Sequence, residues 1–436
     1  VSLLDKSLII RLPSTEREPR YRLLESTRDY ALEKLAEAGE TAALQRAYAQ
    51  HMVAVFGAAQ RRWADTDALV WERNIEPEVE NVRASLAWAF GDGGDDGMAI
   101  ALAARLRPLW RSNLFDRRMA FALVSAAANK LTPETPAEDA AWLWYALAAD
   151  TSTSARVRAD AAERARGLFE ALGDRQMVGV ALALAAYTLA LAGDAVGMKR
   201  HADAARAMVP TIPANQNKAT ILFNLGAAMM IAGGDVADLA AVEYDLAAAL
   251  EIFERFNNHR GMLEVSINLA EIQAVRGDYH AAIELATRNA VEYRSRRAWY
   301  GLVHSLTNLA SYCLLAEDNA AAARAVREAL PLIADLDEQQ LGAIFAGSLA
   351  LLAARAGALE MAASLKGYEE HYYISNGQAR EPIERRVHEA LMGLFAAAEA
   401  DGTLSGAKRV QLMQAGAEMT ADAVQQLGRT VLAKIG

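Results

Sequence analysis

The chain has 436 residues, of which 53% are hydrophobic, and its 45 basic and 55 acidic residues give a net charge of −10. This composition excludes a disordered chain, and scattered basic residues match a phosphate backbone poorly, so we expect no direct binding of nucleic acid. One cysteine, Cys313, excludes an internal disulfide and is expected in the core. We find no membrane-spanning run and no signal peptide, so we expect a cytoplasmic protein that does not bind membranes.

Residues 1–23 differ from the rest of the chain. Ser7 to Leu12 alternates between polar and apolar residues, which is typical of a strand. A polar loop at residues 13–19 and a returning strand at residues 20–23 complete a predicted β-hairpin, and the helix that follows is predicted to end at Gly39. A hairpin of this size must pack on helices. Since the chain also opens at Val1 without a methionine, we expect a fragment of a larger protein.

Residues 41–150 are predicted to be helical, with their tryptophans in the core. Gly91 to Gly97 (GDGGDDG) predicts a loop between two helices. It is not expected to cradle a phosphate, because no lysine follows and acidic residues fill it. Thr132 to Asp139 (TPETPAED) predicts a break that also supplies helix caps.

The segment from Glu264 to Ala290 predicts two amphipathic helices that meet at Gly277 and Asp278. Gly277 can adopt the left-handed conformation that ends a helix, and Asp278 can cap the next one. The pattern recurs: similar tripeptides start 44, 40 and 40 residues apart, at Asn224, Asn268, Asn308 and Ser348. Nine residues after each of these comes a predicted helix end, at Gly233, Gly277, Glu317 and Gly357. A period of this length predicts a solenoid of helical hairpins over residues 151–365.

The repeated pattern resembles tetratricopeptide (TPR) repeats, although their period is usually about 34 residues. In TPR proteins the position of these asparagines faces the concave groove, where an amide can bond a peptide backbone. The resemblance implies a ligand- or partner-binding groove with eight candidate residues: Asn224, Asn268, Asn308, Glu271, Ser311, Ile231, Val275 and Leu315. The expected occupant is a peptide, protein or small-molecule effector, or a helix of the chain itself. The alternative is that each asparagine only bonds a neighbouring helix and fixes the packing of the hairpins.

Further segments carry a second resemblance. Residues 3–9 (LLDKSLI) with residues 20–40 (RYRLLESTRDYALEKLAEAGE), and residues 76–88 (EPEVENVRASLAW), resemble parts of bacterial STAND regulators, which are signal-transduction ATPases with numerous domains. Residues 361–436 resemble the usual C-terminal segment of that family. The resemblance implies a transcriptional regulator whose DNA-binding module and ATPase, with its ATP or ADP, lie upstream of Val1. It also implies the domain limits: 1–40, the end of a winged-helix module; 41–150, a helical segment; 151–365, TPR-like repeats; and 366–436, a helical cap.

No motif in the chain predicts catalysis. There is no P-loop, no H-E-x-x-H and no G-x-S-x-G. His371 and His388 lie near glutamates but are expected to be surface residues rather than metal ligands, and the pair Glu369 and Glu370 predicts a solvated face. The basic cluster at residues 294–297, beside Trp299 and Tyr300, could bind an anion or pair with acidic helices.

We therefore predict an all-α, TPR-like solenoid of antiparallel helix hairpins with a short N-terminal β-hairpin. Its predicted function is that of a non-catalytic sensor and partner-binding region that couples ligand binding to its own upstream ATPase domain. The alternative is a free-standing TPR-like scaffold for protein–protein interaction. A groove enzyme is a third hypothesis, without a nucleophile–base pair or metal cluster to support it.

Overall fold

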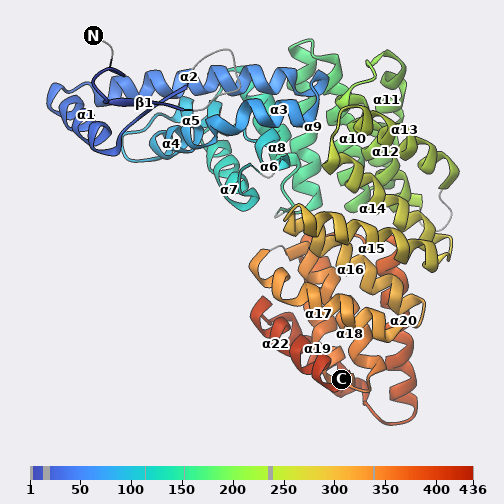
Figure 1. The fold of residues 1–436 in the computed structure, drawn as a ribbon. Coiled ribbons are helices and arrows are strands. Elements are labelled where there is room, and N and C mark those ends of the chain that lie inside the picture. The colour runs from blue at the N-terminus through green and yellow to red at the C-terminus, as the bar shows by residue number, and fades with distance from the viewer. Residues whose placement is uncertain are drawn as a thin grey trace.

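A computed structural model shows a chain built almost entirely of α-helices, with two short strands near its N-terminus (Figure 1). It describes residues 3–12, 20–112, 114–151, 153–233, 239–336 and 339–435. The predicted loop at residues 13–19 lies outside these ranges. The helices form two parts that meet at an angle: an N-terminal arm up to α8 and a column of stacked helix hairpins. The predicted all-α class is confirmed.

The N-terminal β-hairpin pairs β1 (Ile9–Leu12) with β2 (Arg20–Leu23) in antiparallel register, Ile9 opposite Leu23. β1 begins two residues later than predicted, because Ser7 has a left-handed φ of 57°. The helix α1 (Glu25–Ala38) follows and ends at Gly39, as expected. No residue of α1 is buried, so the hairpin and α1 add little to the core of the described chain.

The rest of the N-terminal arm is a cluster of short helices around an apolar core. Its helices are α2 (Thr41–Arg62), α3 (Ala68–Ile75), α4 (Val79–Phe90), α5 (Asp96–Ala103), α6 (Arg107–Arg111), α7 (Arg117–Ala128) and α8 (Ala137–Ala148), with 3-10 turns η1 (Trp63–Asp65) and η2 (Glu76–Glu78). Of the tryptophans here, Trp71 and Trp110 are buried in this core and the others are half-buried.

Both predicted loops of the arm are shorter than expected. Gly97 belongs to α5, because Asp95 caps that helix by accepting a hydrogen bond from the amide of Met98 at 3.0 Å. Asp139 belongs to α8, where its carboxylate is buried and lies 2.7 Å from the guanidinium of Arg105. In each case the predicted loop is shorter, because one of its aspartates stabilises the helix that follows.

The column consists of helices that alternate between an inner and an outer wall. After α9 (Ala155–Ala171), the inner helices are α10 (Arg175–Leu191), α12 (Gln216–Gly233), α14 (His259–Val275), α16 (Trp299–Leu315) and α18 (Gln339–Arg355). The outer helices are α11 (Ala195–Met208), α13 (Leu239–Arg255), α15 (Tyr279–Ser295), α17 (Asn319–Leu336) and α19 (Leu359–Asn376), with the turn η3 (Val209–Thr211) after α11. Each inner helix packs on the next inner helix and on its own outer partner, which is the arrangement predicted from the 40-residue period.

The turns within the hairpins explain the recurring sequence. Gly277 has a φ of 86°, and Asp278 caps α15 by accepting a hydrogen bond from the amide of Ala281 at 3.0 Å. The equivalent residue of the next repeat is Glu317, which adopts a φ of 64° without being glycine. The left-handed turn is therefore dictated by the repeat, and at Glu317 it carries a steric cost from the Cβ.

The C-terminal segment does not simply continue the stack. It comprises α20 (Pro382–Ala400), α21 (Gly406–Ala417) and α22 (Ala421–Ile435). Helix α20 crosses the inner wall, where it packs on α18, α16 and α14. Arg386 donates hydrogen bonds of 2.8 Å to the carbonyl oxygens of Ala274 and Val275 at the end of α14. Before it, the amide of Ala379 donates to the carbonyl oxygen of Leu191 at the end of α10 (2.7 Å).

The remaining C-terminal helices cover the end of the column. Helix α21 approaches α19 so closely that a Cβ added to Gly367 would strike the backbone of Met413, and one added to Gly416 would strike that of Ser364. Helix α22 packs on α17. The predicted domain limit at residue 366 falls inside α19, and the domain limits remain predictions.

A buried ion-pair network joins α19 to the segment that precedes α20. Lys366 is completely buried, and its Nζ lies 2.7 Å from Glu369 and 2.9 Å from Glu370. Arg380 contacts the same two carboxylates at 3.1 and 2.7 Å. The prediction that Glu369 and Glu370 form a solvated face is therefore wrong, because Lys366 pairs with them from the same helix and the fold adds Arg380 and buries Glu369.

Polar contacts fix the angle between the arm and the column. The amide of Gln216 in α12 is buried and donates to the carbonyl oxygens of Trp63 at 2.7 Å and Thr66 at 2.9 Å. Arg260 in α14 donates to the carbonyl oxygens of Trp110 and Arg111, both at 3.1 Å. Residues about 150 positions apart in the sequence are therefore in contact where the arm meets the column.

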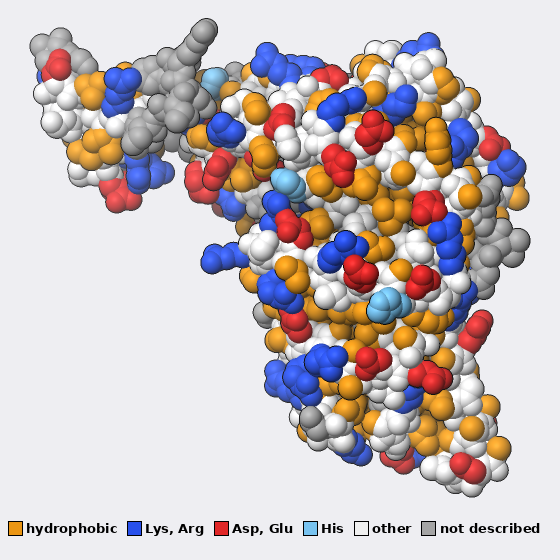
Figure 2. Space-filling model, turned by 45° about the vertical axis from the view of Figure 1, so that its right-hand side comes forward, with side chains coloured by type: hydrophobic (Ala, Val, Ile, Leu, Met, Phe, Trp, Pro, Cys, Tyr) orange, Lys and Arg blue, Asp and Glu red, His pale blue; other side chains and the backbone are white. Residues whose placement is uncertain are grey.

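The visible surface carries a mixture of charges. In Figure 2, acidic and basic side chains are interspersed over the face shown, with apolar patches between them. Among the described residues, no helix is both long enough and apolar enough to span a membrane.

Candidate ligand-binding cavity

An inner cavity of ≈ 230 Å³ lies where the arm, the column and α20 meet. Its walls come from α6, α9, α10, α12, α14, α16, α18 and the N-terminal turn of α20. We call it the inner cavity. Six of the eight candidate residues line it: Asn224, Ile231, Asn268, Glu271, Asn308 and Ser311. They converge because α12, α14 and α16 each present the same repeat position to the inner wall.

The other two candidates, Val275 and Leu315, lie outside the inner cavity. Val275 is buried in an apolar cluster that contains Ile383 of α20, and Leu315 is half-buried against the same cluster. The prediction placed both on an open groove. That part of the groove is covered because α20 folds back over the ends of α14 and α16.

Two of the three asparagines have unused hydrogen-bonding groups. Asn224 is 8% exposed, and its side chain bonds no described residue. The Nδ2 of Asn268 is shielded from solvent and has no hydrogen-bond partner in the described structure. Asn308 differs, because it lies beside the hydroxyl of Tyr312 and hydrogen-bonds it. A buried amide without a partner costs free energy, so packing alone accounts for Asn308 better than for Asn224 and Asn268.

Glu271 and Ser311 are held by neighbours within the inner wall. The Tyr312 hydroxyl donates to Oε2 of Glu271 at 2.9 Å, and the Ser311 and Ser348 hydroxyls are 2.8 Å apart. Burial raises the pKa of Glu271 to about 7, although the bond from Tyr312 opposes the rise. This carboxyl is therefore only partly ionised at neutral pH.

Two more carboxyls enter the inner cavity from the start of α20. Glu384 accepts hydrogen bonds of 2.8 Å from the Tyr373 hydroxyl and from the backbone amide of Glu381. Burial, with mutual repulsion, raises the pKa of Glu381 well above its usual range, and burial also raises that of Glu384. Neither forms an ion pair with a described residue. Together with Glu271 they make one end of the inner cavity acidic.

The opposite end of the inner cavity is basic. Arg107 stacks on the ring of Tyr145 at 4.2 Å, and burial lowers its pKa to about 10. Arg158 is 4% exposed and donates from Nε to the carbonyl oxygen of Ala148 at 3.2 Å. Among the described residues neither guanidinium has a carboxylate partner.

A cluster of two arginines and one glutamate lies beside them. Glu264 accepts from Arg111 at 3.0 Å and from Arg260 at 2.8 Å. Burial alone would raise the pKa of Glu264, but the two guanidinium groups outweigh it and lower this pKa to about 2. Two guanidinium groups share this one carboxylate, so the cluster adds positive charge to the basic end, where Arg107 and Arg158 have no described carboxylate partner.

Aromatic side chains lie between the two ends. Burial raises the pKa of the Tyr187 hydroxyl, Glu381 raises it further, and Arg158 lowers it, so this hydroxyl lies within reach of both ends. His304 also lines the inner cavity, and burial lowers its pKa to about 4, which keeps the ring neutral at physiological pH.

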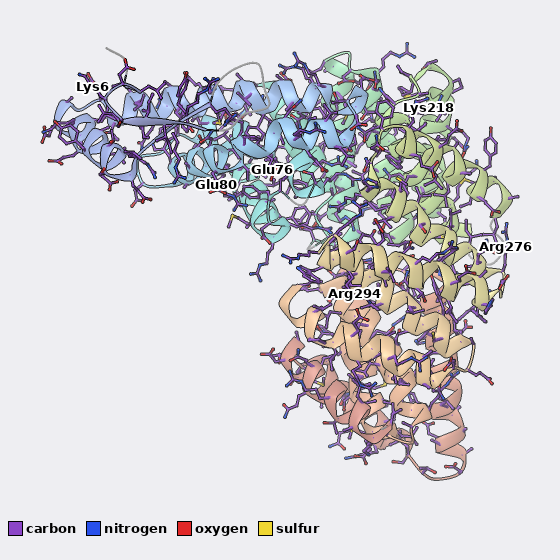
Figure 3. All side chains as sticks on the ribbon, viewed as in Figure 1. Lys6, Glu76, Glu80, Lys218, Arg276 and Arg294 are labelled. Atoms are coloured by element: carbon purple, nitrogen blue, oxygen red, sulfur yellow. The ribbon has the colours of Figure 1, made fainter. Side chains whose placement is uncertain are left out.

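A second space, the outer cavity of ≈ 740 Å³, adjoins the inner cavity and shares Arg117, Tyr300 and His304 with it. The basic cluster at residues 294–297 lies at its edge. Figure 3 labels Arg294 near the inner corner of the bend. Nε of Arg294 is 2.9 Å from Glu328 of α17, and Arg296 lies 2.6 Å from Glu292. The two alternatives for this cluster are anion binding and pairing with acidic helices, and these two arginines form the pairs.

Sequence patterns did not identify the two charged ends. Arg107 and Arg158 come from helices outside the repeat register, and Glu381 and Glu384 belong to a helix whose docking site is more than 100 residues away in sequence. The only local signal is Glu381 before Pro382, which predicts a helix start and nothing about its neighbours. Among the described residues, no group of three or more His, Cys, Asp or Glu side chains could hold a metal ion.

The comparisons with known proteins give a partial relationship. No family model matches the chain. Proteins named as HTH-type transcriptional regulators of Mycobacterium tuberculosis and Mycobacterium bovis are 36% identical over 110 residues, which is 25% of this chain and 12% of each relative. The matched segment thus spans about an eighth of those relatives.

One solved structure is also similar. It is that of Rap protein complexed with competence and sporulation factor, with 13% sequence identity, coverage of 83% of this chain and 99% of that chain, and a TM-score of 0.49. A likeness at this level says nothing about a ligand. Part of this chain, 110 residues, is therefore similar in sequence to HTH-type transcriptional regulators.

Proposed function

We propose that this chain is the effector-binding arm of a STAND-type, ATP-dependent transcriptional regulator. The observation that carries the proposal is the inner cavity, where Asn224 and Asn268 have no described partner for their amides and lie beside guanidinium and carboxyl groups that no described residue pairs. Such groups are costly unless a ligand satisfies them. The local identity to HTH-type regulators supports the regulatory class.

The N-terminal hairpin supports a partner upstream. Many of its large apolar side chains are exposed, as are those of α1: Leu3, Ile10, Tyr21, Leu23, Leu24, Tyr30 and Leu32. Solvated apolar surface of this extent is typical of an interaction site. In the proposal this face packs on the rest of a winged-helix module, and the ATPase with its ATP or ADP lies beyond it.

The proposed mechanism is a population shift. The inner cavity has walls from the arm, the column and α20, so an effector that touches all three favours the arrangement in which they meet. Because residues 1–40 continue from the arm, that bias reaches the upstream module. The coupling is reciprocal, so a nucleotide that favours the same arrangement tightens effector binding.

The test of the cavity compares four forms of the chain after exposure to the low-molecular-weight fraction of a bacterial cell extract. Native mass spectrometry should detect a bound species on the wild type that is lost from the double variant Asn224→Leu with Asn268→Leu and from the double variant Asn268→Ala with Asn308→Ala. Asn289→Ala is the matched control, since Asn289 is also a buried asparagine whose Nδ2 has no described partner, but it lies on α15 and does not line the inner cavity. Equal adducts on all forms would contradict effector binding in the inner cavity.

The test of the regulator is genetic and biochemical. The reading frame upstream of Val1 should encode a Walker motif, whereas a start codon near residue 1 would favour the free-standing scaffold. In the full-length protein, the extract fraction should change the rate of nucleotide exchange, and the Asn268→Ala, Asn308→Ala variant should not respond.

A further inference from the structure

The inner cavity is lined by two guanidinium groups and by buried carboxyls, and no described residue forms an ion pair with either set. Arg107 and Arg158 are the guanidinium groups, Glu381 and Glu384 are the carboxyls, and the charged groups that act on Glu381 include neither arginine. By contrast, Glu264 beside them is paired with two arginines. The unpaired guanidinium and carboxyl groups therefore mark positions where a bound molecule can supply the partners.

The basic end fits a carboxylate. A guanidinium offers a planar fork of N–H donors that matches the two oxygens of a carboxylate. Arg158 is held by the carbonyl of Ala148 through Nε, and Arg107 by stacking on Tyr145. Both are fixed before a ligand arrives, which lowers the entropic cost of binding.

The acidic end fits an ammonium group. Glu384 is oriented by the hydroxyl of Tyr373 and the backbone of Glu381, and Glu271 by Tyr312. An ammonium has three donors and can satisfy several carboxylate oxygens at once. A purely anionic ligand would leave this end without a partner, and a polyamine would leave the basic end without one.

Between the ends, the wall offers amides. Asn224 is more than nine-tenths buried and bonds no described residue through its side chain, and the buried Nδ2 of Asn268 has no partner among the described residues. A side-chain amide pairs donor and acceptor with a peptide group. A free amino acid has no peptide group, so it would leave these amides unsatisfied.

We infer that the inner cavity binds a short peptide with both ends free, its C-terminal carboxylate at Arg107 and Arg158 and its N-terminal ammonium at Glu381 and Glu384. This inference rests on the proposed function of effector binding in the same cavity. The adjoining outer cavity gives side chains of the peptide room to extend toward Tyr300 and His304.

The test uses libraries of random short peptides in four forms: both ends free, N-acetylated, C-amidated, and both ends blocked. Affinity selection on the whole chain, read by mass spectrometry, should retain peptides with two free ends. Blocking either end should reduce retention by about tenfold or more, because each removes a charged hydrogen-bonding group. Equal retention of all four libraries, or retention of none, would overturn the inference.

Variants assign the ends. Arg158→Gln and Arg107→Gln should each abolish the preference for a free C-terminus and keep that for a free N-terminus, and Glu381→Gln should do the reverse. A merely structural role would weaken all libraries alike, which would also overturn the assignment. Arg175→Gln, an exposed residue at the start of α10, should change neither preference. If no peptide is retained but extract adducts persist on the wild type and not on the asparagine variants, the peptide inference fails while effector binding in this cavity stands.

Discussion

The buried carboxyl of Glu271 makes the stability of the fold depend on pH in a predictable direction. Its pKa rises from an ordinary 4.5 to about 7, chiefly through burial, which corresponds to about 3 kcal/mol at 1.36 kcal/mol per pKa unit. Between these values the native state holds a proton that the unfolded chain has released. The stabilising contribution of the protonated group is therefore complete below about pH 4.5 and is lost as the pH rises through about 7.

The variant Glu271→Gln removes this dependence. Near pH 5 it should be close to the wild type, or less stable by about 1 kcal/mol through a poorer bond from Tyr312. Near pH 8.5 it should be the more stable form, with a change of about 3 kcal/mol in the difference between the two proteins across this range. Urea unfolding followed by circular dichroism measures both differences.

The control is Glu251→Gln, which changes an exposed glutamate on α13 and should give the same small difference at both pH values. If the stability difference between Glu271→Gln and the wild type does not change between pH 5 and pH 8.5, Glu271 does not hold its proton in the folded state. The raised pKa of Glu271 at the acidic end of the inner cavity would then be wrong.

Three further predictions concern the packing of the column. Lys366→Met should lower the free energy of unfolding by about 3–5 kcal/mol in urea denaturation, because it leaves two carboxylates to share one described cation, Arg380. Gly367→Ala should destabilise the chain by about 1–3 kcal/mol because its Cβ would strike the backbone of α21, whereas Gly393→Ala, with open space around it in α20, should stabilise it by about 0.5–1 kcal/mol. Glu317→Gly should raise the thermal midpoint by relieving about 1 kcal/mol of left-handed strain, whereas Glu360→Gly in α19 should lower it.

Much of the column follows from local sequence. The 40-residue period identifies the hairpins because each repeat repeats the same turn, and Gly277 with Asp278 specifies that turn chemically. The period even assigns Glu317 to the left-handed position, where residue type alone would not place it. Cys313 is buried as expected, because the same register puts it on the inner helix α16.

The elements that the sequence did not predict depend on distant contacts. The docking of α20 on the inner wall is fixed by Arg386 against carbonyl groups of α14 that lie more than 100 residues away. Carboxylates are usually solvated, so the sequence predicts Glu369 at the surface. Lys366 is within reach of it on the same helix, but the burial of the pair depends on the packing of α18 against it, which the local sequence does not show. The docking of α20 also covers Val275 and Leu315, so these two candidate residues lie outside the inner cavity while the other six line it.

The position of α20 bears on how an effector could act. Its N-terminal turn supplies Glu381 and Glu384 to the inner cavity, and its next turn is tied to α14 through Arg386. Burying these carboxyls without a cation is unfavourable when they are ionised, so the docked position of α20 is destabilised as they lose their protons. A ligand that brings a positive group to them removes this cost and favours the docked position by its difference in affinity for the two arrangements. The acidic end would then couple ligand binding to the junction that α20 forms with α10 and α14.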